Sequence, residues 1–314
     1  MSMAQKRARR NARIQTYRKQ VKAWWEKKRS SEERSLPEPY TADTSNYLTP
    51  TPFKEKFDLD KKVHTWAWLG WGAVKMNELL RENKAKTPTG KTSITAIIDD
   101  YEGPLDVHPD QILLRTSMRK SQRKRGEYTL PPTTSPREPY PVCPGGKRPL
   151  VGFCGALYPS TPWRKPLIDQ LTQDTRIATK FILRKGFWNG GNGGTIGDKT
   201  LIRDFQKNIE ETQFTVCCRG GGNFSFRFYE TLAAGRIPVL TEDDISLPFE
   251  EYIDYSKIIV IGKTPGQVAN GIWKVWRSGD VEAMQRRCAE ISKEFLQRPN
   301  YSVKLLEQLT KDGY

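Results

Sequence analysis

The residues best suited to chemistry lie between Cys217 and Pro248. This stretch reads as a short apolar strand over residues 214–217, a loop Arg219-Gly220-Gly221-Gly222, a helix over 224–234 and a second strand over 237–240. A strand, a glycine turn, a helix and a strand form a βαβ unit. In an open parallel sheet, ligands bind at the carboxyl ends of the strands. We therefore expect the polar residues of this stretch to gather at one site.

The charges of this stretch suit a phosphorylated ligand. Asn223 or Ser225 falls at the start of the expected helix, where free N–H groups and the helix dipole favour an anion. Arg227, on the first turn, can bind a phosphate through two parallel hydrogen bonds. Glu230 lies three residues later on the same face, and a carboxylate there suits the hydroxyls of a ribose. The alternative is an Arg–Glu helix pair above an ordinary turn.

These residues resemble the exostosin-type glycosyltransferases (glycosyltransferase family 47), in the runs Arg219 to Glu230, Ala234 to Val239 and Leu247 to Phe249. The resemblance extends from about Leu150 to Ile261. It implies a GT-B fold, in which two Rossmann-like domains face each other across a cleft. It also implies a nucleotide-sugar donor on the C-terminal domain, and inversion at the anomeric carbon without an essential metal or a further cofactor. Family members usually have Pro where this chain has Cys218.

Composition agrees with a folded protein of two domains. The chain has 314 residues, 36% of them hydrophobic, which supports folded cores and argues against a disordered chain. Its five cysteines form no CxxC pair, so neither a disulfide framework nor a zinc site is expected, and a reducing cytoplasm fits best. No apolar run approaches the roughly 20 residues of a membrane span, and no signal peptide is recognisable. We expect a cytoplasmic protein that is not secreted, unlike cellular exostosins, which a membrane segment typically anchors in the Golgi.

Residues 1–36 carry twelve basic and three acidic residues, which is +9 of the formal net charge of +16. Ile14, Tyr17, Val21 and Trp24 recur at helical spacing, so the sequence predicts a basic amphipathic helix. Such a helix suits peripheral contact with an anionic membrane or with nucleic acid. It can equally pack on the protein itself or remain solvated. A nucleic-acid-binding protein would leave the glycine loop unexplained, so nucleic acid is the less favoured partner.

We divide the chain into a basic tail (1–36), a Pro-rich linker (37–56), an N-terminal acceptor-side Rossmann-like domain ending in a second Pro-rich linker (57–148), a C-terminal nucleotide-sugar-binding Rossmann-like domain (149–279), and C-terminal helices that cross back (280–314). Predicted strands are 92–98, 111–114, 150–154, 179–183, 214–217, 237–240 and 257–261. Predicted helices are 63–80, 224–234, 267–276, 281–296 and 303–309, with another beginning at Pro166.

The first domain is expected to supply a catalytic base. The apolar run over 92–98 ends in Asp99, Asp100 and Glu102, and the end of a strand is where an α/β domain keeps its chemistry. Glycosyl transfer needs one base to take a proton from the acceptor hydroxyl. One of these three carboxylates is the candidate, and His64 is a weaker one. The alternative is an acidic turn that caps a strand.

Other cations are expected at the ends of strands in the second domain. Gly155 and Arg164 fit the first strand-to-helix loop, which in GT-B folds approaches the donor phosphates, and Lys185 follows the next strand. The alternative for Arg164 and Lys185 is exposure to solvent. The donor-binding candidates are Arg219, Gly221, Gly222, Asn223, Ser225, Arg227, Glu230, Gly155, Arg164 and Lys185.

We interpret the chain as a two-domain α/β glycosyltransferase, a hexosyl- or pentosyltransferase. By resemblance it moves a sugar from a UDP-sugar to a hydroxyl of a glycan or glycoconjugate. The alternatives are a fucosyltransferase-like GT-B enzyme that uses a GDP-sugar, and a basic protein that binds nucleic acid or an anionic surface. The sugar, the acceptor and the linkage are not indicated by the sequence.

Overall fold

The computed structural model describes residues 57–65, 72–87, 89, 92–132, 138–157, 161–184, 199–241 and 244–314. The predicted basic tail (1–36) and the first Pro-rich linker (37–56) lie outside the described residues.

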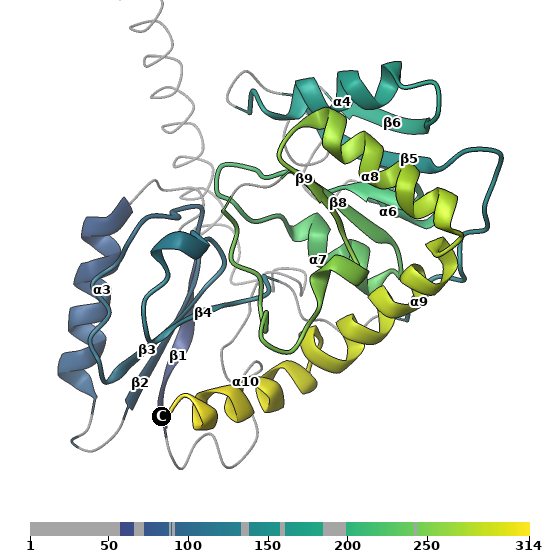
Figure 1. Ribbon diagram of the computed structural model, residues 1–314. Coiled ribbons are helices and arrows are strands. Elements are labelled where there is room, and N and C mark those ends of the chain that lie inside the picture. The colour runs from purple at the N-terminus through teal and green to yellow at the C-terminus, as the bar shows by residue number, and fades with distance from the viewer. Residues whose placement is uncertain are drawn as a thin grey trace, which may run out of the picture. The chain divides into compact units, whose positions relative to one another are not determined.

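The first sheet is built from four parallel strands. They are β1 (Phe57–Thr65), β2 (Thr92–Ile98), β3 (Gln111–Arg115) and β4 (Glu127–Thr129), in the order β1-β2-β3-β4. Helix α3 (Gly72–Lys86) connects β1 to β2 and lies along this sheet (Figure 1). Strands β2 and β3 are almost completely buried, which explains why they read as continuous apolar runs without alternation.

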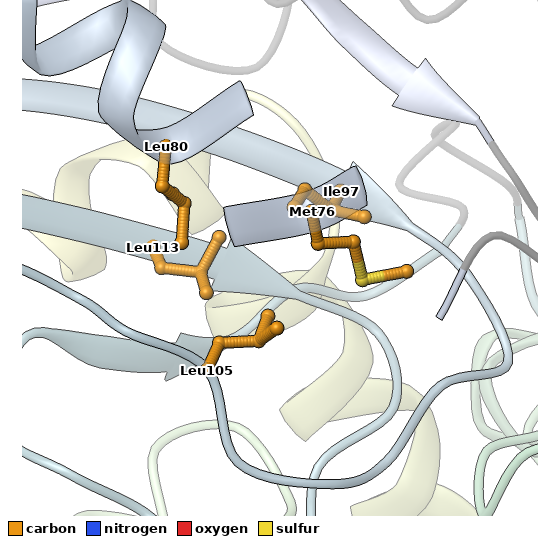
Figure 2. Packing of buried hydrophobic residues seen from close by; sticks show 5 residues of the cluster. All are labelled: Met76, Leu80, Ile97, Leu105 and Leu113. Carbon is orange, nitrogen blue, oxygen red and sulfur yellow. The ribbon is translucent and has the colours of Figure 1, made fainter. Parts of the chain in front are cut away.

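A small apolar cluster joins α3 to the sheet. Met76 and Leu80 are four residues apart and therefore share one face of the helix. They pack with Ile97, Leu105 and Leu113, as Figure 2 shows. Leu80 and Leu113 are completely buried. This cluster positions the end of β2, where the acidic residues begin.

The second sheet has five parallel strands. They are β5 (Leu150–Ala156), β6 (Ala178–Arg184), β7 (Phe214–Val216), β8 (Ile237–Thr241) and β9 (Val260–Gly262), in the order β6-β5-β7-β8-β9. The chain winds outward in one direction from β5 to β6 and in the other from β7 to β9. Strand order therefore reverses between β5 and β7, and the crevice outside their carboxyl ends is the expected ligand position in such a sheet.

Helices cover this sheet and extend beyond it. They are α4 (Arg164–Gln173), α6 (Lys199–Glu210), α7 (Phe226–Ala233), α8 (Pro265–Ser278), α9 (Val281–Ile291) and α10 (Asn300–Lys311), with short turns of 3₁₀ helix at Lys120–Gln122 and Tyr255–Lys257 and of π helix at Ser292–Leu296. Helix α4 packs against α8, and α7 packs against α9. None of the helices in the described ranges has the length and apolar character that crossing a membrane requires.

The predicted α/β class, with a parallel sheet in each of the two regions, is confirmed. The prediction of a helix over 63–80 is wrong at its start. Val63 and His64 belong to β1, which pairs with β2 along its length and has a bulge between Leu59 and Val63. Pairing of the backbone with a buried neighbouring strand outweighs the local helical spacing of apolar residues, and the helix begins only at Gly72.

The predicted strand over 257–261 also begins later than expected. Lys257 closes a turn of 3₁₀ helix that Asp254 caps, since the Asp254 side chain accepts a hydrogen bond from the Ser256 N–H. Strand β9 starts at Val260. The apolar run predicted a strand that is too long, because Ile258 and Ile259 are buried but do not pair with β8.

The segment before β5 has no helix or strand over residues 138–149, and side chains of the second region hold it. Gln285 pairs with the backbone of Cys143, accepting from its N–H (2.9 Å) and donating to its carbonyl (3.0 Å). The buried guanidinium of Arg236 donates to the carbonyls of Pro141 (3.0 Å) and Glu210 (2.6 Å). These bonds satisfy a buried cation and fix the segment in place.

Helix α10 contacts β4 of the first sheet. The Tyr128 hydroxyl donates to Asp312 Oδ2 (2.6 Å), and the Tyr301 hydroxyl donates to the carbonyl of Thr129 (3.4 Å). The C-terminal helix therefore contacts the sheet that the N-terminal part of the chain forms.

The cluster in Figure 2 generates a stability prediction. Leu113→Ala should lower the free energy of unfolding by about 2 to 5 kcal/mol, because it leaves a cavity between α3 and the sheet. Val74→Ala, at a position on α3 that is 73% exposed, should change it by less than about 0.5 kcal/mol. Chemical denaturation followed by circular dichroism measures both. Equal effects of the two substitutions would contradict the assignment of Leu113 to the core.

Candidate functional site

The three candidate carboxylates follow β2, and each has a different environment. Asp99 closes the turn: its Oδ1 accepts from the Tyr101 N–H (2.6 Å), and its own N–H donates to Thr116 Oγ1 (3.1 Å). Burial raises the pKa of Asp99. Its carboxylate is occupied in holding the turn, which is the capping role that the sequence left open.

Glu102 lies between two arginines. Arg119 Nη2 is 2.6 Å from its Oε1, and Arg219 Nη2 is 2.8 Å from its Oε2. Arg119 comes from the segment after β3, whereas Arg219 belongs to the glycine loop after β7. Glu102 therefore joins the two parts of the chain through charge-assisted hydrogen bonds.

Asp100 is the carboxylate with the most perturbed proton affinity. Burial raises its pKa from the ordinary value to about 6, against a hydrogen bond from the Gly222 N–H and the charge of Arg219, which lower it. Asp100 also lines an open cavity of about 400 Å³, together with Tyr101, Glu102, Arg119 and Gly221 among others. A carboxylate that is half buried, with a pKa near neutrality, has the properties of a general base.

The glycine loop lies directly on Asp100. A Cβ on Gly222 would lie 2.6 Å from the Asp100 carbonyl oxygen and 2.8 Å from its Cα, and would also overlap Ser117 Oγ. A Cβ on Gly221 would overlap the Asp100 carboxylate, with Cγ at 3.1 Å. These two glycines therefore leave room for the acidic turn.

Asn223 fixes the end of this loop. Its Oδ1 accepts from the Met118 N–H (3.1 Å), and its Nδ2 donates to the Met118 carbonyl (2.9 Å). The side chain is 2% exposed. An amide that satisfies both backbone groups of one residue holds two segments in register, as strand pairing does.

Two side chains at the start of α4 hold the other end of the loop. Arg164 donates from Nε (3.0 Å) and Nη2 (2.8 Å) to the Arg219 carbonyl, and from Nη1 to the Ala156 carbonyl (3.1 Å). Trp163 Nε1 donates to the same Arg219 oxygen (3.2 Å). The Arg219 guanidinium lies over the Trp163 ring, 5.0 Å from its centroid. Arg164 thus supports the loop, and its expected contact with phosphate stays a prediction.

Arg227 lies where the strand order reverses. Its Nη2 donates to the carbonyl of Cys154, two residues before the end of β5 (2.5 Å), and its Nη1 donates to the carbonyl of Val216 at the end of β7 (3.3 Å). Its Nε is buried without a hydrogen-bond partner among the described residues. A Cβ on Gly155 would be 3.1 Å from Arg227 Nη2, so this glycine gives the guanidinium its space. A fixed cation therefore marks the expected ligand crevice.

Helix α7 begins beside a small cavity. Ser225 is its extended N-terminal cap and lines a cavity of about 10 Å³ with Arg219, Asn223 and Thr241 among others. That volume suits about one water molecule, so a nucleotide needs surface beyond it. Glu230 is half buried on the same helix, one turn from Arg227. The expected roles of Ser225 towards an anion and of Glu230 towards a ribose stay predictions.

The remaining candidates are placed only in part. His64 lies in β1, where its backbone pairs with Ile97, and Lys185 lies outside the described residues. Their roles stay predictions. Within the residues whose placement is described, no group of three or more His, Cys, Asp or Glu side chains is arranged to hold a metal ion.

Sequence reasoning missed the role of the basic run over 119–125. Members of this run bind particular groups in distant parts of the chain. Lys120 pairs with Glu250 (3.2 Å), the Ser121 N–H donates to Asp244 Oδ1 (3.0 Å), and Arg125 donates to the Asp312 carbonyl (3.4 Å). No local signal could have shown this, because the acceptors lie more than 100 residues away.

The two sheets agree with what a comparison with known families finds. Residues 97–266, more than half of the chain, match the model of the exostosin GT47 domain. The chain therefore belongs to this family, and its two parallel α/β sheets are those of the GT-B fold that the family implies. The matched range includes the acidic turn, the glycine loop and Arg227.

Similar solved structures include TarM, the pneumococcal O-GlcNAc transferase GtfA in complex with UDP and GlcNAc, and the spinosyn rhamnosyltransferase SpnG. Their sequence identities are 11%, 12% and 10%, and their TM-scores are 0.41, 0.34 and 0.36. The matches cover 71%, 76% and 73% of this chain, and 50%, 59% and 75% of the solved chains. The chain thus spans about half the length of TarM and three fifths of GtfA. A search of curated proteins finds no match.

The contact between the glycine loop and Asp100 is testable with two glycine substitutions. Gly222→Ala should destabilise the protein by about 1 to 3 kcal/mol, because the new methyl group overlaps backbone atoms of Asp100. Gly266→Ala in the first turn of α8 has no atom within 4 Å of the new methyl, and should be neutral or stabilising by up to about 1 kcal/mol. Thermal unfolding compares the two, and a neutral Gly222→Ala would refute the close approach.

Proposed function

We propose that the protein is an inverting glycosyltransferase that moves a sugar from a nucleotide-sugar to a hydroxyl of a glycan or glycoconjugate. One observation carries the proposal: Asp100, a carboxylate with a raised pKa in an open cavity, lies against the glycine loop that precedes the Arg227 helix. The loop that lies on the proposed base thus leads directly into the helix that carries Arg227, the proposed cation for the leaving group. Membership of the exostosin family supports this interpretation.

Asp100 is proposed as the base, in preference to its two neighbours. Asp99 is occupied by the turn, and Glu102 is paired with two arginines. In the reaction, Asp100 takes the proton of the acceptor hydroxyl as that oxygen forms a bond to the anomeric carbon. The bond between the anomeric carbon and the diphosphate oxygen breaks at the same time. Attack opposite the leaving group inverts the configuration at that carbon.

The departing nucleoside diphosphate needs compensation for its charge. Arg227 lies at the reversal of strand order, and the N-terminus of α7 follows directly after the loop. Fixed cations and helix N-terminal N–H groups can stabilise such an anion without reorganisation. Glu230, one turn along α7, is proposed to bind the ribose hydroxyls. The preference for UDP over GDP follows from the family resemblance.

The base assignment predicts the effect of one isosteric substitution. Asp100→Asn should reduce the rate of transfer by about 10² to 10⁴-fold, because the amide cannot accept the proton, while donor binding is retained. In the wild type, the rate should rise as pH increases through about 6, since Asp100 must lose its own proton before it can act. Asp254→Asn, at an exposed aspartate, is the matched control. Full activity of Asp100→Asn would exclude this base.

The donor site predicts a selective loss of nucleotide binding. Isothermal titration of UDP and of GDP without added metal should show binding of UDP to the wild type. Glu230→Ala should weaken it by about tenfold or more, because a hydrogen bond to a charged group contributes roughly 1.5 to 3 kcal/mol. Glu294→Ala removes an exposed glutamate after α9 and should bind as the wild type does. Preference for GDP would favour the fucosyltransferase-like alternative, and binding of neither nucleotide would contradict the donor site.

A further inference from the structure

Asn223 stands between the glycine loop and α7, and it determines where the loop lies. Its buried amide pairs with both backbone groups of Met118, a residue 105 positions earlier in the chain. Met118 follows the end of β3 and is itself buried. The pairing therefore joins the donor-side loop to the part of the chain that carries the acidic turn.

The residues next to this pair are in contact as well. Gly222 precedes Asn223, and Ser117 precedes Met118, with Ser117 Oγ packed against Gly222. Gly222 also lies on the Asp100 backbone, and its N–H donates to the Asp100 carboxylate. Ser117 and Met118 after β3 thus contact Gly222 and Asn223 of the loop. A displacement of Asn223 must also move the Gly222 N–H, which donates to the Asp100 carboxylate.

We propose that Asn223 is a positioning residue for Asp100: by pairing with Met118, it seats the glycine loop on the carboxylate and so controls the access of water to it. The inference rests on the proposed function, because only there does Asp100 act as a base. It adds that the loop next to the donor site also sets the strength of that base.

The charged groups around Asp100 shift its pKa in both directions. Asp99 and Glu102 face it from its own turn, Arg219 faces it from the loop, and Arg119 lines the same cavity. The two arginines pair with Glu102, so their charges are partly compensated. Exclusion of water is the largest influence on the proton affinity of Asp100. Loosening of the loop should therefore lower its pKa, although the Gly222 hydrogen bond is lost too.

The chain contains a matched control for this amide. Gln285 makes the same two hydrogen bonds to the backbone of Cys143, is 1% exposed, and belongs to α9. Gln285 also accepts from Arg236 Nη1 (3.3 Å), so its removal is at least as disruptive. Asn223→Ala and Gln285→Ala thus remove the same chemistry, and only the first removes it beside Asp100.

The experiment follows the side-chain carboxyl signal of Asp100 by ¹³C NMR in the full chain, with Asp100→Asn for assignment. We expect a midpoint near pH 6 in the wild type and in Gln285→Ala. In Asn223→Ala, the midpoint should fall by about one pH unit or more, towards that of a solvated aspartate. The acidic limb of the rate of transfer should move in the same direction, and the maximal rate should decrease.

Two outcomes of the NMR titration would overturn the proposal. An unchanged midpoint in Asn223→Ala would show that the loop does not control Asp100, and equal shifts in both variants would show a general loosening of the fold. If Asn223→Ala does not fold, Asn223→Gln replaces it: this variant keeps donor and acceptor but displaces the loop by one methylene, and the same direction of shift is expected.

The NMR titration needs no turnover, so the two hypotheses can fail separately. A shifted midpoint in a protein without transferase activity would contradict the proposed function and leave the coupling of Asn223 to Asp100 intact. Activity that depends on Asp100 but has the same acidic limb in Asn223→Ala would support the proposed function and refute the positioning role.

Discussion

A methyl group at position 222 would overlap the backbone of Asp100, and the rest of the site depends on this close approach. Because the loop can lie on the acidic turn, Asn223 reaches Met118, Arg219 reaches Glu102, and the Asp100 carboxylate is partly shielded from water. Each of these contacts joins residues more than 100 positions apart. The absence of a side chain at two positions thus permits a site that neither sheet could form alone.

The positions of the strand ends determine which polar groups can belong to the site. In the first sheet, β2 delivers the acidic turn, and in the second, β5 and β7 end at the position where strand order reverses. Arg227 donates to backbone carbonyls near the carboxyl ends of both β5 and β7. Its position is therefore set by backbone groups, which makes it a well-defined cation for a ligand to meet.

Much of this arrangement could be predicted from the sequence, because it depends on local patterns. The apolar run over 92–98, the glycine loop and the helix that contains Arg227 and Glu230 all follow from spacing within a few turns of chain. The partners of Asn223 and Arg219 could not be predicted, because Met118 and Glu102 belong to the region of the other sheet. Those of Arg164 are backbone carbonyls, which no side-chain pattern reveals. Strand β1 was missed because only its pairing with β2 reveals it.

The segment over 119–125 is bound by distant parts of the chain. It is held by Asp244 and Glu250 after β8 and by Asp312 at the end of α10. The two sheets are therefore not interchangeable modules. In a recombinant of two family members, the contacts of the segment over 119–125 would be preserved only if residues 244–250 and the last turn of α10 came from the same parent as that segment. Exchange of whole domains at the Pro-rich linker would separate them.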